Sequence, residues 1–284
     1  MKVLILGASG MLGNAALRTF VRDDRFDVFG AIRSSHSLAL FPADIRSKLV
    51  LGTDIENLDG MLRLFDLVRP EVVINCIGLV KQLSDADDPL AAIPINSILP
   101  HRLARICAVA RARLIHMSTD CVFSGLKGDY LESDFADAKD LYGRSKLLGE
   151  VDYPNTITLR TSIIGHELSG NKSLLGWFLT QEGEVKGFKR AVFSGLPTFE
   201  IARIIKDYVI PDKNLRGIYH VSSQPINKFD LLTLIAKTYG KKIDIHADED
   251  FVIDRSLNSQ RFKDATGYRP ASWEQLVSSM QKFQ

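Results

Sequence analysis

The chain opens with a short apolar run that leads directly into a glycine-rich turn. Residues 2–6 (KVLIL) fit a buried parallel strand, and a helical apolar pattern begins at Leu12. A strand, a glycine-rich turn and a helix in this order are what a dinucleotide-binding βα unit requires. Gly7 permits the tight turn, Gly10 lets a pyrophosphate approach the backbone, and Gly13 lets the helix pack closely on the strand. The sequence therefore predicts a nucleotide-binding turn rather than an ordinary glycine-rich loop.

Alternating strand and helix patterns continue beyond this turn. Apolar runs predict strands at residues 28–32, 48–51, 72–75, 113–117 and 156–160, and 3.6-residue periodicity predicts helices at residues 12–22, 58–68, 100–112 and 140–151. Such alternation, with right-handed crossovers, gives a doubly wound parallel sheet of the Rossmann type. The sequence therefore predicts an α/β fold.

The regular alternation weakens after about residue 163, and residues 216–222 predict one strand that returns to the sheet. We therefore expect two parts, in line with the roughly two domains that 284 residues suggest. The predicted dinucleotide-binding domain comprises residues 1–162 together with about 214–223. The predicted smaller α/β cap comprises residues 163–213 and 224–284.

Composition excludes several other classes of protein. The net charge of +2 gives no overall basic field for nucleic acid, and no apolar run reaches the ~18 residues that span a bilayer. The apolar start is too short for a signal peptide. Cys76, Cys107 and Cys121 are too few and too irregularly spaced for a disulfide framework or a zinc site, which favours a reducing cytoplasm. We interpret the acidic residues 85–88 as a solvated loop and expect no metal site.

The end of the second predicted strand distinguishes the two nicotinamide dinucleotides. NAD-binding proteins usually carry an acidic residue there, which holds the ribose 2′-hydroxyl. Here the strand ends in Arg33 and Ser34, and Asp27 lies at its start. A guanidinium and a hydroxyl suit a 2′-phosphate, so we expect NADPH, with NADH or a simple exposed arginine as alternatives. After the third strand come Asp54 and Ile55, where Asp54 either contacts adenine or caps a turn.

Three residues of the middle region form a candidate catalytic group. Thr119 ends the fifth predicted strand, and ligands of open α/β sheets bind at that end. Tyr142 and Lys146 lie four residues apart and therefore on one helix face. A free tyrosine titrates near ~10, and an adjacent ammonium lowers that pKa enough for acid–base chemistry. Each pattern alone also fits a surface helix pair or a strand-end turn, but their order after the glycine-rich turn is specific.

Together these motifs resemble the extended short-chain dehydrogenase/reductase superfamily, in which the glycine spacing G-x-x-G-x-x-G also occurs. Within it, the resemblance is strongest to the dTDP-4-dehydrorhamnose reductases and their sugar-nucleotide relatives. The matching stretches are residues 7–13, 73–75, 118–125, 142–150 and 159–160, with weaker similarity at residues 195–198, 217–220 and 254–273. The resemblance thus extends over nearly the whole chain.

The resemblance implies an NADPH-dependent reduction of a nucleotide-linked 4-keto-6-deoxyhexose, in deoxysugar or cell-surface polysaccharide biosynthesis. Tyr142 would protonate the alkoxide, Lys146 would lower the tyrosine pKa and hold the nicotinamide ribose, and Thr119 would orient the carbonyl. A homodimer is compatible with this resemblance. The residues expected to contact the cofactor are Gly7, Ser9, Gly10, Met11, Leu12, Gly13, Arg33, Ser34, Asp54, Ile55, Cys76, Ile77, Gly78, Tyr142 and Lys146.

The resemblance also implies that the C-terminal cap holds the nucleotide diphosphate of the substrate. Arg255 is the expected phosphate contact, because a guanidinium suits phosphate oxygens, and Arg190 and Arg261 are weaker candidates. Asn96 is expected to order the site. The further residues expected on the substrate side are Asp120, Cys121 and Phe123.

Cys121 departs from the reductase pattern, in which a tyrosine typically follows the S-T-D motif. GDP-fucose synthases carry a cysteine two residues after the catalytic serine and use it in epimerisation, and Thr119 and Cys121 have that spacing. Cys121, with His166 as a partner, would then give an epimerase/reductase, whereas the simpler interpretation is an apolar residue lining the pocket. The absence of a glutamate after Asp120 disfavours dehydration. A non-catalytic regulatory subunit is the remaining alternative, because this fold also serves that role.

Overall fold

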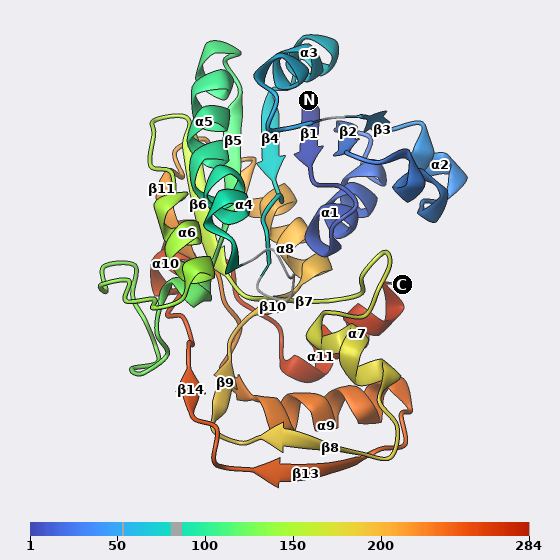
Figure 1. Ribbon diagram of the computed structural model, residues 1–284, viewed down its shortest axis with the longest axis vertical. Coiled ribbons are helices and arrows are strands. Elements are labelled where there is room, and N and C mark those ends of the chain that lie inside the picture. Colours follow the sequence, from blue (N-terminus) through green and yellow to red (C-terminus); the bar gives the residue numbers. More distant parts are fainter. Residues whose placement is uncertain (53, 81–86, 284) are drawn as a thin grey trace.

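The computed structural model describes residues 1–52, 54–80 and 87–283 (Figure 1). Its main element is a seven-stranded parallel sheet in the order β11-β6-β5-β4-β1-β2-β3. The strands are β1 (Lys2–Leu6), β2 (Asp27–Ile32), β3 (Leu49–Leu51), β4 (Val72–Asn75), β5 (Arg113–Thr119), β6 (Thr156–Thr161) and β11 (Gly217–His220). This order confirms the predicted doubly wound α/β fold, and β11 brings the chain back to the sheet edge.

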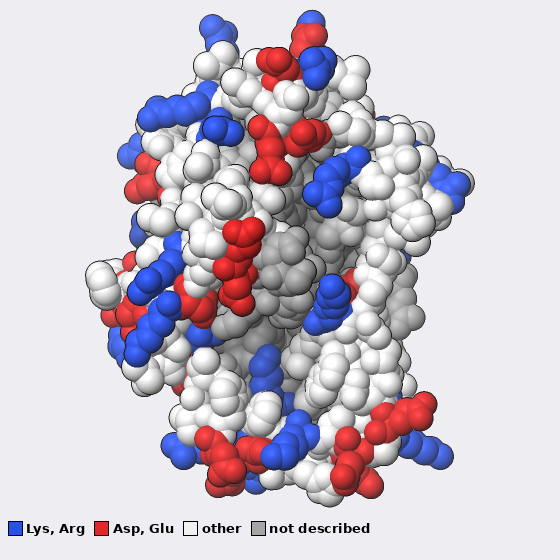
Figure 2. All heavy atoms as spheres, viewed as in Figure 1, with Lys and Arg blue, Asp and Glu red and all other residues white. Residues whose placement is uncertain are grey.

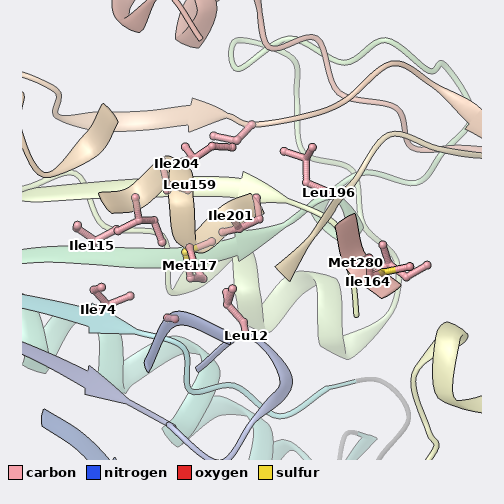
Figure 3. Packing of buried hydrophobic residues seen from close by; sticks show 14 of the residues in the cluster. Leu12, Ile74, Ile115, Met117, Leu159, Ile164, Leu196, Ile201, Ile204 and Met280 are labelled. Atoms are coloured by element: carbon pink, nitrogen blue, oxygen red, sulfur yellow. The ribbon is translucent and has the colours of Figure 1, made fainter. Parts of the chain in front are cut away.

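Alternate residues of each strand face opposite helix layers. Val3 and Ile5 of β1 pack into the cluster that includes helices α1 (Met11–Val21) and α8 (Thr198–Ile204), whereas Leu4 and Leu6 pack toward the opposite layer. That opposite layer contains α3 (Leu58–Val68) and α5 (Leu99–Val109). Because both faces are covered, the strands consist of nearly continuous apolar runs. Figure 3 shows one of these layers, where Leu12, Ile115 and Ile201 meet between helix and sheet.

The helix expected over residues 100–112 begins earlier than predicted. The structure has α4 (Pro89–Ala92), a π-helical segment η3 (Ile93–Ile98) and then α5, so a helical path runs from Pro89 to Val109. Proline lacks a backbone N–H, and a π-type turn is one way for a helix to continue past Pro94. The helix after β5 is α6 (Leu141–Leu148), close to the predicted range. Between β2 and β3 lie two short helices, η1 (Ser35–Leu40) and α2 (Ala43–Arg46).

Smaller sheets and helices form the region on the carboxyl-end side of the main sheet, toward which β1 and β4 point (Figure 1). The strand groups are β7 (Ile163–Ile164) with β10 (Leu196–Pro197), β8 (Glu184–Phe188) with β13 (Asp244–Asp248), and β9 (Ala191–Phe193) between β12 (Ile226–Asn227) and β14 (Ile253–Asp254). The helices are η4 (Asp120–Val122) after β5, η5 (Ile205–Val209) after α8, α7 (Leu174–Thr180), α9 (Lys228–Tyr239), α10 (Gln260–Thr266) and α11 (Trp273–Lys282). Helix α8, although inside the predicted cap range, packs against α1 on the main sheet.

The described residues offer neither a membrane-spanning helix nor a cluster of metal-ligating side chains. No helix within the described residues has both the length and the apolar character for crossing a bilayer. Among those residues, no group of three or more His, Cys, Asp or Glu side chains is arranged to hold a metal ion. Asp85, part of the acidic stretch 85–88, lies outside the described residues. On the face drawn in Figure 2, positive and negative side chains are interspersed.

Candidate active site

The glycine turn between β1 and α1 is shaped by close backbone contacts. Gly7 adopts a left-handed conformation with φ of 76°, and the Gly10 N–H donates to the Gly7 carbonyl at 2.9 Å. A Cβ atom at Gly13 would lie 2.1 Å from the Gly7 carbonyl oxygen, so only glycine fits there. Gly10 is the N-cap of α1 and has no side chain to satisfy the first N–H groups, which leaves them for an anion. The turn therefore fits a pyrophosphate.

The other residues of this turn differ in how they are placed. Ser9 and Met11 are half-buried at the helix start. The Leu12 side chain is buried in the core, so only its backbone is available to a ligand.

The residues expected at the adenosine end lie at the carboxyl ends of β2 and β3. Arg33 is exposed and has no hydrogen-bond or ion-pair partner among the described residues. The Ser34 hydroxyl accepts the His36 N–H at 3.2 Å and so caps η1. Asp54 accepts the Glu56 N–H at 3.1 Å, the turn-capping alternative, and Ile55 packs on the core. At the adenosine end, the Arg33 guanidinium is therefore available to a ligand.

The segment after β4 lies against the helix that carries Lys146. A Cβ atom at Gly78 would lie 3.8 Å from Lys146 Nζ, and Cys76 is an electrostatic neighbour of the same ammonium. The buried Asn96 side chain accepts the Leu79 N–H at 2.9 Å and donates to the Leu79 carbonyl and to Ser145 Oγ, both at 3.1 Å. Asn96 therefore ties this segment to α6. Ile77 donates its N–H to Asn75 Oδ1 at 3.1 Å.

Thr119 and Tyr142 meet because α6 packs tightly on the chain that follows β5. A Cβ atom at Gly143 would lie 2.2 Å from the Cys121 carbonyl oxygen, so a glycine is needed beside Tyr142. Burial raises the pKa of Tyr142, and a hydrogen bond with Thr119 opposes that effect. The Thr119 hydroxyl also donates to Asp120 Oδ1 at 3.1 Å and accepts the Cys121 N–H at 3.1 Å.

Lys146 is buried beneath this pair. Its ammonium donates to the Met117 carbonyl of β5 at 2.7 Å. Burial lowers the pKa of Lys146 to about 8, and the nearby Glu150 carboxylate opposes the shift. Lys146 therefore carries a positive charge near neutral pH and loses its proton readily at alkaline pH.

The substrate-side residues converge on the segment after Thr119. Arg255 donates from Nε to the Phe123 carbonyl at 2.8 Å and from Nη1 to Cys121 Sγ at 3.5 Å. Burial, together with the Asp120 carboxylate, raises the pKa of Cys121 to about 12. Burial also raises the pKa of Asp120, although Arg255 and Lys228 oppose this. Phe123 is fully buried and stacks on Tyr130, so its ring is a packing element.

Three further sequence candidates lie in other surroundings. Arg190 is exposed in the turn between β8 and β9, and the Arg261 guanidinium lies 4.5 Å from the centre of the Tyr219 ring. His166 contacts Tyr239, with Nε2 2.9 Å from the phenolic oxygen. Of the three arginines considered, Arg255 is thus the one for which the structure records contacts with the segment after Thr119.

Sequence reasoning missed Lys228, the first residue of α9. Its ammonium lies 4.1 Å from the centre of the Phe193 ring and has Asp120 and Cys121 as electrostatic neighbours. Burial lowers the pKa of Lys228 to about 8. A lysine at the start of a helix carries no motif, so no sequence pattern identified it.

A buried polar network supports the carboxyl ends of β5, β6 and β11. Arg160 forms a two-point ion pair with Glu150, with both N–O distances 2.7 Å, and Ser118 donates to Glu150 at 2.6 Å. Arg160 Nη1 lies 3.2 Å from His220 Nε2, and the Tyr130 carbonyl lies 3.0 Å from His220 Nδ1. Four of these residues, Ser118, Glu150, Arg160 and His220, lie within stretches that resemble the family pattern, although the sequence predicted no role for their side chains. They hold the strand that ends in Thr119.

The parallel strand order, the glycine turn and the Thr119–Tyr142–Lys146 group define a protein of the extended short-chain dehydrogenase/reductase type. The chain belongs to the family described as RmlD substrate binding domain, which matches residues 1–282. This finding confirms the family resemblance seen in the sequence.

Individual relatives carry two different kinds of name. A dTDP-4-dehydrorhamnose reductase from Aggregatibacter actinomycetemcomitans is 24% identical, covering 99% of each chain. Methionine adenosyltransferase 2 subunit beta from Danio rerio is 27% identical, covering 84% of this chain and 74% of that one. The crystal structure of dTDP-4-dehydrorhamnose reductase from Bacillus anthracis in complex with NADP has a TM-score of 0.80 and 20% identity, covering 99% of this chain and 98% of that one.

Proposed function

We propose that this protein is an NADPH-dependent reductase of a nucleotide-linked 4-keto-6-deoxyhexose, acting in deoxysugar or cell-surface polysaccharide biosynthesis. The observation that carries the proposal is the joining of Thr119 to Tyr142 above buried Lys146, at the strand ends beside the glycine turn. The name of the Aggregatibacter relative supports the same substrate class. We further propose that residues 163–213 and 224–284 form the cap, apart from α8, which packs against α1 on the main sheet.

The glycine turn and Arg33 support NADPH as the cofactor. The turn fits a pyrophosphate, and the Arg33 guanidinium, which has no partner among the described residues, suits a 2′-phosphate. Asp27 pairs with Lys48 at 3.2 Å at the far end of β2, away from the ribose position. The B. anthracis reductase was solved with NADP, which supports the same choice, and NADH is the alternative.

The reaction requires one hydride and one proton. Bound NADPH would supply the hydride for the carbonyl carbon from its nicotinamide C4. Thr119 donates a hydrogen bond to the carbonyl oxygen, and Tyr142 transfers its phenolic proton to that oxygen as negative charge develops. Lys146, a buried lysine one helical turn after Tyr142 on α6, would stabilise the resulting phenolate through its positive charge.

The environment of Cys121 favours reduction without epimerisation. A pKa of about 12 keeps the thiol neutral, so it is a poor base for removing a proton from the sugar. Running the reaction in D₂O tests this directly. We expect no deuterium at sugar C3 or C5, and its incorporation would support the epimerase/reductase alternative.

A regulatory role is the second candidate, supported by the similarity to methionine adenosyltransferase 2 subunit beta. Purified protein should be mixed with NADPH and, in turn, the dTDP-, UDP- and GDP-linked 4-keto-6-deoxyhexoses. We expect NADPH oxidation with at least one of them. Folded protein that binds NADPH but turns over none of the three would favour the regulatory role.

A further inference from the structure

The small sheet β12-β9-β14 carries two cations toward the candidate active site. Lys228 directly follows β12, and Arg255 directly follows β14. Strand β9 lies between them and ends in Phe193, over whose ring the Lys228 ammonium sits. Both cations act electrostatically on Asp120, the residue after Thr119. The two positive groups therefore converge on the same side of the site.

Lys228 is the more unusual of the two because its charge has no ion-pair partner within the part of the chain that the structure describes. Among the described residues, its ammonium has no hydrogen-bond or ion-pair partner, and it lies 4.1 Å from the centre of the Phe193 ring. Its electrostatic attraction to Asp120 does not outweigh burial, since its pKa remains lowered to about 8. It also begins the 12-residue helix α9, whose N-terminus is itself positive. A partly buried cation in this position favours an anionic ligand.

The position of the Lys228 ammonium relative to the reacting atoms indicates which anion binds there. Lys228 interacts electrostatically with Asp120 and Cys121, the two residues that follow Thr119, and Thr119 would hold the sugar carbonyl. In a nucleotide-linked 4-keto sugar, the diphosphate is attached across the ring from that carbonyl. Arg255 uses Nε and Nη1 for protein contacts, which leaves Nη2 for a ligand.

We propose that Lys228 binds the sugar-proximal phosphate of the nucleotide-linked substrate and that Arg255 assists from the opposite side of β9. This inference rests on the proposed function for its substrate class. Lys228 thus selects substrates with a charged diphosphate, while the Thr119–Tyr142–Lys146 group performs the reduction.

Calorimetric binding of dTDP, UDP and GDP, and of the matching nucleosides, tests the proposal without requiring turnover. Lys228→Met keeps the apolar stem over Phe193 but removes the charge. We expect it to weaken the best nucleoside diphosphate about tenfold or more, while the nucleoside changes little. Lys228→Arg should retain most of the affinity, and the Kd for NADPH should be unchanged in both variants.

Lys237→Met is the matched control, because Lys237 is an exposed lysine on the same helix. It should bind every ligand as the wild type does. Equal weakening of nucleoside and diphosphate by Lys228→Met, an unchanged diphosphate affinity, or wild-type protein that binds none of the three diphosphates would overturn the proposal. Diphosphate binding that depends on Lys228 in a protein without reductase turnover would leave this inference standing and contradict only the proposed function.

Discussion

The two ends of the candidate site are built in different ways. At the cofactor end, Gly7 and Gly13 bring the backbone of β1 and α1 so close that no side chain fits. At the substrate end, Lys228 and Arg255 extend from two edge strands of a small sheet toward Asp120. Backbone N–H groups are therefore available to one proposed ligand, and long charged side chains to the other. The first kind of site is fixed by local conformation and the second by tertiary packing.

This difference explains what each end tolerates. A backbone site needs glycine at set spacings, whereas a side-chain site needs only that a cation reach a given point from some element. The following changes test the contrast, beginning with the group between the two ends.

Tyr142→Phe should have the largest effect on turnover. Removing the proposed proton donor should lower kcat by about 10²–10⁴-fold, because general acid catalysis supplies that much. NADPH binding, followed by fluorescence titration, should be nearly unchanged. Tyr153→Phe, at a tyrosine that contacts His101, is the control. A Tyr142→Phe rate above a tenth of the wild-type rate would contradict the assigned role.

Arg160→Met should destabilise the buried network that supports the strand ending in Thr119. The variant leaves the Glu150 carboxylate buried without its ion-pair partner, which costs about 3–5 kcal/mol. Urea unfolding measures this loss. Arg69→Met removes an arginine that is exposed and paired with exposed Asp66, and should cost less than about 1 kcal/mol. Similar losses in the two variants would show that the buried network has no special role.

Gly13→Ala should damage the cofactor end selectively. Its Cβ would meet the Gly7 carbonyl oxygen at 2.1 Å, and relieving this overlap should cost about 1–3 kcal/mol of stability and weaken NADPH at least about tenfold. Gly10→Ala is the graded comparison, because its Cβ would lie 3.3 Å from the same oxygen and should disturb the fold less. Intact NADPH binding by Gly13→Ala would remove the basis for a backbone-defined site.

Arg33→Ala should change the choice of dinucleotide rather than abolish binding. Losing a charge-assisted contact to the 2′-phosphate should lower the ratio of kcat/KM for NADPH over NADH by about tenfold. Arg63→Ala, at an exposed position of α3, should leave the ratio unaltered. If the ratio is the same in Arg33→Ala and wild type, another residue selects the cofactor.

The smallest expected effect is a pH dependence that separates the two lysines. Lys146 and Lys228 both have a pKa lowered to about 8, so each is charged below and neutral above that value. The wild-type kcat should therefore fall by about half between about pH 7 and pH 8 as Lys146 loses its proton. As Lys228 loses its proton over the same range, the KM for the substrate should rise. Lys228→Met should show the same loss in kcat but no such rise in KM. A kcat that increases through this range would contradict the role of Lys146.

Much of the fold could be predicted because parallel strands buried on both faces give continuous apolar runs between glycines and prolines. The start of the α4–η3–α5 helical path was missed, because Pro94 and Pro100 suggest a later helix start and only packing shows that the chain stays helical. Asn96 and Phe123 illustrate the same limit. The sequence marks both residues as candidates for the site. Only the folded chain shows that Asn96 bridges two segments and that Phe123 stacks on Tyr130.

The sequence by itself determined the features that depend on neighbours along the chain. Gly7, Gly10 and Gly13 shape one turn, and Tyr142 and Lys146 share one helix face, because a few bonds fix those relations. Tertiary structure alone decided that Lys228 and Arg255 approach Cys121 and Asp120 from more than a hundred residues away. It also decided that Glu150, Arg160 and His220 meet beneath Thr119. A charge acts through space, so its role is set by the fold that positions it rather than by its neighbours in sequence.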